Sequence, residues 1–387
     1  MDKLTALPPL SLYIHFPWCI QKCPYCDFNS HEIKKGIPEE EYINALLKDL
    51  ENDLPLVWGR KITTIFMGGG TPSLFSPEAM DTLLSGIRAR IPVSPNAEIT
   101  IEANPGTVEN EYISGFKEAG INRISFGVQS FNDDILKKLG RIHNAESARQ
   151  AIKKAKSAGF DRINIDLMFA LPGQSLAQAK FDLESAITLS PTHISYYQLT
   201  IEPNTAFYHN PPTVPNDDAS WEIFQQGKSI LKDAGFDQYE VSAYATNGDQ
   251  CRHNTNYWLF GDYLGIGAGA HAKITDGAQQ SITRYWKHKH PKEYLSSVKK
   301  TALAGQQKLT DKELLFEFLM NGLRLNNGFA VELFCNRTGL TDDALNKQLH
   351  SMVNEDLIEW NKSHNTIAAT EKGKMFLNNI LERCLPD

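Results

Sequence analysis

Short hydrophobic runs alternate with longer amphipathic stretches over the first 200 positions of the chain. The runs are typical of β-strands, and the stretches between them repeat apolar residues at the spacing of helices that bury one face. We predict strands at residues 11–16, 61–67, 97–103, 122–127, 162–168 and 193–199. We predict helices from residue 38 onward and at 77–90, 108–119, 133–139, 145–158 and 176–189. The pattern indicates an α/β fold, a parallel sheet or barrel with helices outside.

Polar or glycine-rich sequence ends or follows each predicted strand. In chain order these groups are three cysteines, Gly68-Gly69-Gly70-Thr71-Pro72, Glu102-Ala103-Asn104-Pro105, Gln129-Ser130, Asp166 and Gln198-Leu199-Thr200. In β/α barrels the active site lies at the carboxyl ends of the strands. We therefore expect these groups to meet on one rim. The glycine run lacks the Lys-Ser/Thr of a phosphate-binding P-loop, so a tight turn remains the alternative to a cofactor role.

Cys19, Cys23 and Cys26 carry the most specific chemistry in the chain. A [4Fe–4S] cluster is normally held by four cysteines, so three thiolates would leave one iron open. A structural zinc site is the alternative, but it would need a distant fourth ligand because the other cysteines stand alone. A disulfide framework is disfavoured in a chain of this length. The first ten residues have no apolar stretch typical of a secretory leader, which favours the cytoplasm.

Composition narrows the classes of function. The formal net charge of −7 disfavours a general nucleic-acid binder, because such proteins usually carry basic patches. No apolar run reaches the roughly 18 residues of a membrane span. The 387 residues are enough for one large core and a second, smaller domain. We place the domains at residues 1–300 and 305–387.

The motif Cys-x-x-x-Cys-x-x-Cys, with Tyr25 before its last cysteine, resembles the signature of the radical S-adenosylmethionine superfamily. The resemblance implies a partial (β/α)6 barrel and a [4Fe–4S] cluster on the three cysteines. It also implies that the open iron chelates S-adenosylmethionine through its amino and carboxylate groups. Such a cofactor supplies the difficult chemistry, while the protein positions it.

Longer segments resemble the branch of this superfamily that contains the oxygen-independent coproporphyrinogen oxidases. They are "YIHFPWCIQKCPYCDF", "FMGGGTPSLF", "IEANPGT", "RISFGVQSFNDDILKKLGRIH" and "INIDLMFALPGQ". The resemblance implies that S-adenosylmethionine is contacted by Tyr13, Tyr25, Gly69, Gly70, Thr71, Glu102, Gln129, Arg141 and Asp166. Two departures count against porphyrinogen decarboxylation. Phe28 stands where these oxidases have a further cysteine, and only twelve residues precede Tyr13.

A second motif, His253-Asn254-Thr255-Asn256-Tyr257-Trp258, resembles the heme-binding signature of the heme chaperones of the HemW family. That resemblance extends over nearly the whole chain. It implies binding of heme b by His253, Tyr257 and Trp258, and transfer to apo-hemoprotein acceptors. The alternative is an oxygen-independent coproporphyrinogen III dehydrogenase. Whether S-adenosylmethionine is cleaved, and so whether the protein is an enzyme, stays open, as do a homodimer and peripheral membrane contact.

The chemistry of the second motif is consistent with heme. A neutral imidazole is a common axial ligand, and aromatic rings offer flat apolar area to a porphyrin. In a helix His253 and Tyr257 share one face. Cys251 and His271 are competing candidate ligands. If S-adenosylmethionine is cleaved, the cluster needs an electron donor such as flavodoxin or ferredoxin.

From about residue 305 the strand–helix alternation stops. We predict helices at 309–323 and 342–354, a β-hairpin at 357–369 that turns near His364-Asn365, and a last helix from Glu371. This order resembles a winged helix. Acidic residues outnumber basic ones in this part, which argues against DNA binding. We expect a lid over the barrel mouth or a partner-docking domain.

Overall fold

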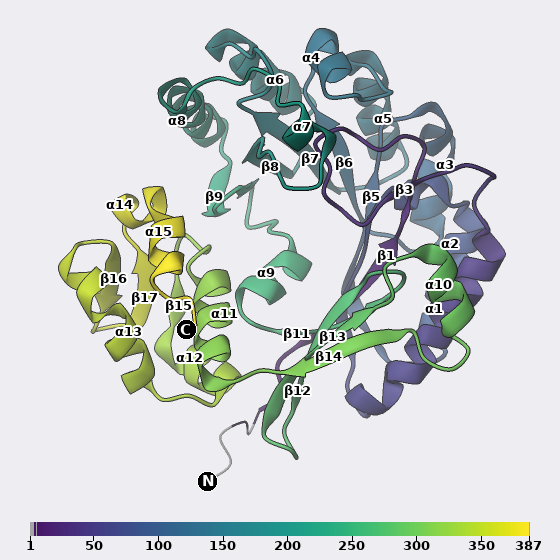
Figure 1. The fold of residues 1–387 in the computed structure, drawn as a ribbon. Helices are drawn as coiled ribbons and strands as arrows, with labels where there is room; N and C mark the ends of the chain where they lie inside the picture. Colours follow the sequence, from purple (N-terminus) through teal and green to yellow (C-terminus); the bar gives the residue numbers. More distant parts are fainter. Residues whose placement is uncertain (1–3, 5, 387) are drawn as a thin grey trace.

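The computed structural model describes residue 4 and residues 6–386, and Figure 1 shows a curved sheet with helices along its outer side. Six parallel strands form the middle of the sheet, in the order β1-β4-β5-β6-β7-β8. Their bounds are Leu10–Phe16 for β1, Ile62–Gly69 for β4, Val93–Ala103 for β5, Arg123–Gln129 for β6, Arg162–Phe169 for β7 and His193–Gln198 for β8. All six predicted strands are present, so the predicted α/β architecture, a partial (β/α)6 barrel, is confirmed.

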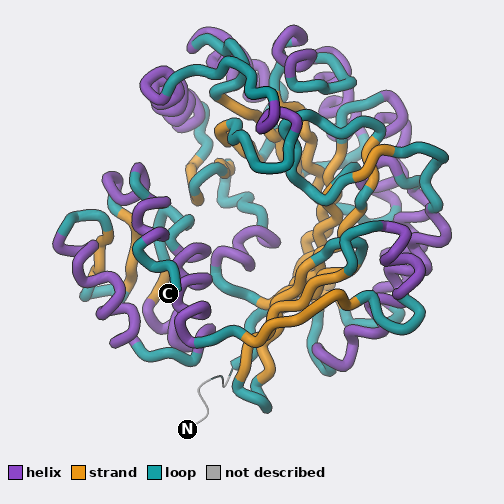
Figure 2. Tube along the Cα trace, viewed as in Figure 1, coloured by secondary structure: helices purple, strands orange, loops and turns teal. Residues whose placement is uncertain are grey.

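The helices between these strands cover the outer face of the sheet (Figure 2). They are α1 (Glu39–Asp53), α2 (Pro77–Arg88), α3 (Thr107–Glu118), α4 (Asp133–Lys138), α5 (Ala145–Ser157) and α6 (Leu176–Thr188). Their starts have local causes. At the start of α2 the Ser76 side chain accepts a hydrogen bond from the main-chain N–H of Ala79, and Pro77 occupies the first helical position. At the start of α6, Ser175 forms a capping box with Gln178. The six predicted helices are therefore confirmed, with small differences at their ends.

Strands between residues 237 and 308 widen the sheet at both edges, which the sequence pattern did not predict. Beside β8 lie β10 (Ala243–Ala245) and β9 (Asp237–Glu240), both antiparallel. At the other edge β11 (Asp262–Ile266) pairs parallel to β1, and β12 (His271–Asp276), β13 (Ser281–Lys287) and β14 (Leu303–Lys308) follow antiparallel. The large sheet thus has twelve strands among the described residues. Residues 305–308, which we had placed in the second domain, belong to its edge strand.

Eight further elements complete the described part of the first 300 residues. They are β2 (Trp18–Cys19), β3 (His31–Glu32), η1 (Leu54–Val57), η2 (Pro72–Leu74), α7 (Ala206–His209), α8 (Asp217–Asp233), α9 (Arg252–Trp258) and α10 (Pro291–Ser297). The parallel pair β2–β3 brackets the three-cysteine segment. In Figure 1, α9 lies on the inner, concave side of the sheet. It therefore places the second motif of the sequence inside the barrel.

A small C-terminal domain follows the large sheet. Its elements are α11 (Asp311–Gly322), β15 (Phe329–Ala330), α12 (Val331–Thr338), α13 (Asp342–Asn354), β16 (Ile358–Asn361), β17 (Thr366–Ala369), α14 (Glu371–Met375) and α15 (Leu377–Glu382). The strands pair in the order β15-β17-β16. The order of helices and strands along the domain is that of a winged helix. The predicted hairpin turns at Asn365, whose φ is 50°. Among the residues that the structure describes, no helix is both long and apolar enough to cross a membrane.

Candidate functional site

The carboxyl ends of the parallel strands enclose a cavity of about 460 Å³, which we call the cysteine cavity. Most residues predicted for the cluster and S-adenosylmethionine line it together: Cys19, Cys23, Tyr25, Cys26, Gly69, Gly70, Thr71, Glu102, Gln129, Arg141 and Asp166. The chain brings them from β2, from the loop after it, from β7, from the ends of β4, β5 and β6, and, for Arg141, from the segment between α4 and α5. The strand ends therefore meet on one rim, as the sequence predicted.

All three sulfur atoms have a hydrogen-bonding side chain nearby, and for Cys26 it is the hydroxyl of Ser30, 3.9 Å from Sγ. The hydroxyl of Thr71 donates to the Sγ of Cys19 at 3.5 Å, and Nη1 of Arg141 donates to the Sγ of Cys23 at 3.5 Å. Burial raises the pKa of Cys19 and of Cys26. Donors of this kind stabilise the thiolate form that a metal ligand requires. The donor set therefore fits an iron–sulfur cluster, although no group of three His, Cys, Asp or Glu side chains in the described part of the chain is close enough to hold a metal ion.

The loop after the cysteines is fixed to the sheet by two side chains. Nδ2 of Asn29 donates to the main-chain oxygens of Ala268 and Lys289, at 2.9 Å each. The Nε2 atom of His15 lies 2.8 Å from the main-chain oxygen of Asn29. These bonds join the cysteine segment to the turn between β11 and β12 and to the segment after β13. Sequence reasoning missed both residues: His15 lies within a family-like segment but has no assigned role there, and Asn29 lies just beyond that segment.

The glycine run combines a tight turn with a binding surface. Gly69 has φ +111°, and a Cβ atom there would lie 2.4 Å from the ring of His15. A Cβ on Gly70 would lie 2.6 Å from the main-chain oxygen of Trp18. Only glycine fits both positions. The absence of side chains lets the backbone of the loop line the cysteine cavity, so the two interpretations of this run are compatible.

Two of the carboxyl groups that line this cavity, Glu102 and Asp166, belong to residues predicted to contact S-adenosylmethionine. Oε2 of Glu102 accepts from the main-chain N–H of Gly69 at 3.1 Å. Burial, with a smaller contribution from the nearby Asp166, raises the pKa of Glu102 to about 8. Asp166 accepts hydrogen bonds from Ser125 and Asn164, and burial raises its pKa as well. A cationic or hydroxyl-bearing ligand would restore the ionised forms.

The remaining predicted residues have structural partners too. Arg141 donates to Oδ1 of Asn104 and to the main-chain oxygen of Gly127, both at 2.6 Å, while its buried Nε has no hydrogen-bond partner among the described residues. Gln129 has a positive φ of 70°, and its Oε1 accepts from the hydroxyl of Tyr197 at 2.8 Å. Asn104 and Tyr197 also line the cavity. Both residues lie at the end of a strand, and Asn104 also lies in the family-like segment "IEANPGT".

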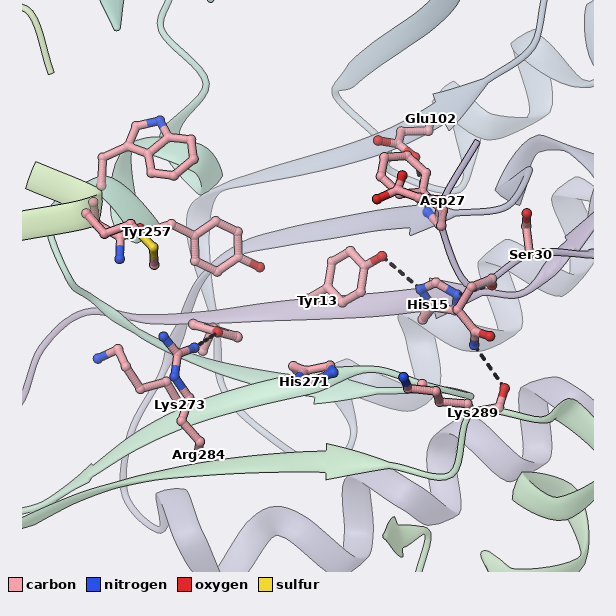
Figure 3. A pocket seen from close by; sticks show the side chains of 18 of the residues that line it. Tyr13, His15, Asp27, Ser30, Glu102, Tyr257, His271, Lys273, Arg284 and Lys289 are labelled. Carbon is pink, nitrogen blue, oxygen red and sulfur yellow. Dashed lines mark hydrogen bonds between the residues drawn. The ribbon is translucent and has the colours of Figure 1, made fainter. Parts of the chain in front are cut away.

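A second cavity of about 820 Å³ adjoins the first, and we call it the aromatic cavity. Its aromatic lining residues are Tyr13, Phe28, Tyr257, Trp258, Phe260 and Tyr263. Figure 3 labels Tyr13 and Tyr257 among them. The two cavities share Asp27, Phe28, Ser30, Gly69 and Glu102. Tyr13, which we expected to contact S-adenosylmethionine, lines only the aromatic cavity, where its hydroxyl lies 2.9 Å from Nδ1 of His15.

Comparison with known proteins places the chain in a family. The model of the radical SAM superfamily matches residues 13–185, and that of the HemN C-terminal domain matches residues 309–376. "Heme chaperone HemW" of Escherichia coli is 50% identical over 99% of this chain and 100% of its own length. The relatives of the same name in Haemophilus influenzae and Bacillus subtilis are 52% and 35% identical, over 99% and 96% of this chain and 100% and 97% of their own.

The chain belongs to the HemW family. The fold likeness extends to coproporphyrinogen III oxidase HemN from Escherichia coli, with a TM-score of 0.83 at 23% identity, over 98% of this chain and 90% of that one. The two family models and this structural likeness agree with the partial barrel and the small C-terminal domain described above.

In this HemW-family protein the three motif residues predicted for heme lie in different environments. Tyr257 and Trp258 line the aromatic cavity, whereas His253 lines neither cavity and is only 1% exposed. Its Nδ1 lies 2.8 Å from the hydroxyl of Thr64, and its Nε2 lies 2.9 Å from the hydroxyl of Tyr257. The predicted shared helix face of His253 and Tyr257 is confirmed, and there the two side chains bond to each other. Burial lowers the pKa of His253 to about 3.

Glu98 on β5 fixes the position of this HemW motif. Its fully buried carboxylate accepts from the main-chain N–H of His253 at 2.9 Å and of Arg252 at 3.2 Å, and pairs with Arg162 at 2.8 Å. A carboxylate is favourable at the start of a helix because the first N–H groups there have no partners within the helix. Sequence reasoning missed Glu98, since a single Glu in a strand pattern carries no motif.

Proposed function

We propose that this protein binds heme in the aromatic cavity and transfers it to apo-hemoproteins, and that it carries a [4Fe–4S] cluster and S-adenosylmethionine in the cysteine cavity. The observation that carries the proposal is the adjacency of the two cavities, which share five lining residues. The names of its relatives, which are heme chaperones, support the same assignment.

The cysteine cavity supports the cluster and its cofactor through its donor set. Cys19, Cys23 and Cys26 would each bind one iron and leave the fourth for S-adenosylmethionine. Glu102 would pair with an ammonium group. The buried Nε of Arg141, which has no partner in the described part of the chain, would suit an anionic group. The cofactor would supply radical chemistry if an electron donor such as flavodoxin or ferredoxin reduced the cluster.

The aromatic cavity supports heme through its size and lining. Its volume lies in the range of roughly 300–1,000 Å³ that is usual for cofactor sites. Aromatic rings from β1, α9 and β11 offer flat apolar area, which suits a porphyrin face. The cavity also holds His271 and the basic side chains of Lys22, Lys273, Arg284 and Lys289. Basic groups of this kind suit the two carboxylates of a heme.

The C-terminal domain supports a role as lid or docking surface. Met320 and Asn321 of α11 form part of the wall of the aromatic cavity. The guanidinium of Arg324 lies 4.3 Å from the ring of Trp258. We propose that the domain, following β14, moves to admit and release heme, and that the acceptor apoprotein docks beside it in the cytoplasm.

The test uses anaerobically reconstituted protein. We expect four iron and four sulfide per chain, a heme absorption band that saturates on titration, and recovery of activity in an apo form of a b-type heme enzyme that exceeds the recovery with free heme. The variant with Cys19, Cys23 and Cys26 all changed to Ala controls for the cluster. Rapid conversion of coproporphyrinogen III would instead favour the dehydrogenase, and failure to bind heme would refute the proposal.

A further inference from the structure

Three imidazole rings line the aromatic cavity, and they differ in what their nitrogen atoms contact. Both nitrogens of His15 have partners, Tyr13 and the main-chain oxygen of Asn29. The Nε2 atom of His31 has no hydrogen-bond partner among the described residues, but it is buried and so not accessible to a ligand. His271 is exposed to the cavity, and no hydrogen bond of the described residues engages its ring. Of the three, His271 alone combines a free ring with access to the cavity.

The position of His271 is fixed by its backbone. It is the first residue of β12 and pairs with Trp286 of β13. A Cβ atom on Gly265 would lie 1.9 Å from the main-chain oxygen of His271, so β11 and β12 approach closely only because residue 265 is glycine. The ring therefore projects from a rigid sheet instead of a loop. Burial, then the positive charges of Arg284 and Lys289, lower the pKa of His271 and favour the neutral imidazole that iron binds.

The basic residues around His271 also differ in whether their charged groups already have partners. Lys273 pairs with Asp262 at 3.3 Å, and Arg284 pairs with Glu317 and bonds to Tyr263. Among the described residues no carboxylate pairs with the ammonium group of Lys289, which is exposed and lines the cavity. Its main chain is held by Asn29. Figure 3 shows His271 between the Lys273–Arg284 pair on one side and Lys289 on the other.

We propose that His271 of β12, and not His253 of the sequence motif, is the axial ligand of the heme iron, and that Lys289 pairs with a heme propionate. This inference rests on the proposed function, because it identifies the groups that hold the heme in the aromatic cavity. His253 then has a positioning role: its bond to Tyr257 orients the aromatic wall.

The experiment is a ferric heme titration of the full-length protein, with resonance Raman detection of the iron–histidine vibration after reduction. The variants are His271→Ala and His253→Ala, with His364→Ala on the exposed hairpin as the matched control. We expect His271→Ala to lose the iron–histidine band, to regain a low-spin spectrum with added imidazole, and to weaken binding by at least the roughly 10- to 100-fold seen when residues supporting a metal ligand are changed. We expect the other two variants to keep the band.

Lys289 is tested by changing the ligand as well as the residue. We expect Lys289→Gln to weaken the binding of heme by about fivefold, as for one exposed charge-assisted contact. We expect it to leave the binding of heme dimethyl ester, whose propionates are blocked, unchanged. An equal effect on both ligands would overturn the role of Lys289.

The outcomes separate this inference from the proposed function. If the unchanged protein binds no heme, the proposed function and the inference both fail. If it binds heme and His271→Ala keeps the iron–histidine band, the ligand assignment is wrong while heme binding stands. Loss of the band in His253→Ala with retention in His271→Ala would assign the iron to the motif histidine instead.

Discussion

Replacement of Glu102 by glutamine tests how much the burial of this carboxyl group in the cysteine cavity lowers the free energy of unfolding. Glu102 lies at the end of β5 and borders both cavities. Burial raises its pKa from 4.5 to about 8, and its one hydrogen bond from the main chain, from Gly69, opposes that rise only in part. The carboxyl group is therefore largely protonated at neutral pH until a cationic ligand arrives.

The magnitude follows from linkage. The unfolded chain releases the proton near pH 4.5 and the folded protein near pH 8, so the folded protein binds more protons between these values. Glu102 therefore costs no stability below about pH 4.5, and its cost grows as the pH rises to about 8, above which it stays constant. The full difference corresponds to about 5 kcal/mol. Because Glu102 is half-buried and borders open cavities, we reduce it to about 2–3 kcal/mol for solvent screening.

The assay is urea unfolding of the metal-free protein at pH 5, 7 and 8.5. We expect the free energy of unfolding of Glu102→Gln, relative to the unchanged protein, to rise by about 2–3 kcal/mol between pH 5 and pH 8.5. Glu118→Gln, the same chemical change at an exposed position of α3, controls for net charge. Glu102→Gln should also bind S-adenosylmethionine more weakly. A stability difference that is flat from pH 5 to 8.5 would refute the burial argument.

Three further substitutions test the framework around the cavities. Glu98→Gln should lower the free energy of unfolding by about 3 kcal/mol, measured by urea unfolding, because it leaves Arg162 with one carboxylate and loosens the start of α9. Gly69→Ala should lower the unfolding temperature clearly more than Gly59→Ala, since both have positive φ but only position 69 meets a ring within 4 Å. Asp49→Asn should lower the free energy of unfolding, by up to about 3 kcal/mol, because it leaves buried Lys287 paired with Asp53 and no longer with Asp49. Adding Lys287→Met should recover part of that loss, and no recovery would contradict the pairing.

The sequence predicted the parallel strands well because their signals are local. Each strand is a buried run flanked by an amphipathic helix, and the caps at Ser76 and Ser175 lie next to the helices they start. The edge strand β14 was missed for the opposite reason. Strands such as β14, where most residues are exposed, are held by pairing with a neighbouring strand. Edge strands of this kind carry a weak pattern, since tertiary pairing outweighs propensity there.

The candidate site shows the same division. The rim of the cysteine cavity could be predicted, because the carboxyl ends of parallel strands must meet at one edge. The direction of the His253 ring could not be predicted. The helix that carries His253 is oriented by Glu98, 155 positions earlier in the chain. A motif therefore identified the helix at the cavity, but only the packing showed that His253 faces Thr64 while Tyr257 and Trp258 face the cavity.

The cysteine loop explains why the two cavities belong to one site. Asp27, Phe28 and Ser30 follow Cys26 directly and line both cavities, and Asn29 between them holds the loop to the main chain of Lys289. Phe28 is 58% exposed, so it presents a flat apolar ring at the boundary where the resembled oxidases carry a thiol. A ligand that orders this loop from one cavity changes the wall of the other. If the proposed cluster and heme occupy the two cavities, such coupling would be reciprocal, and each ligand would change the affinity of the other.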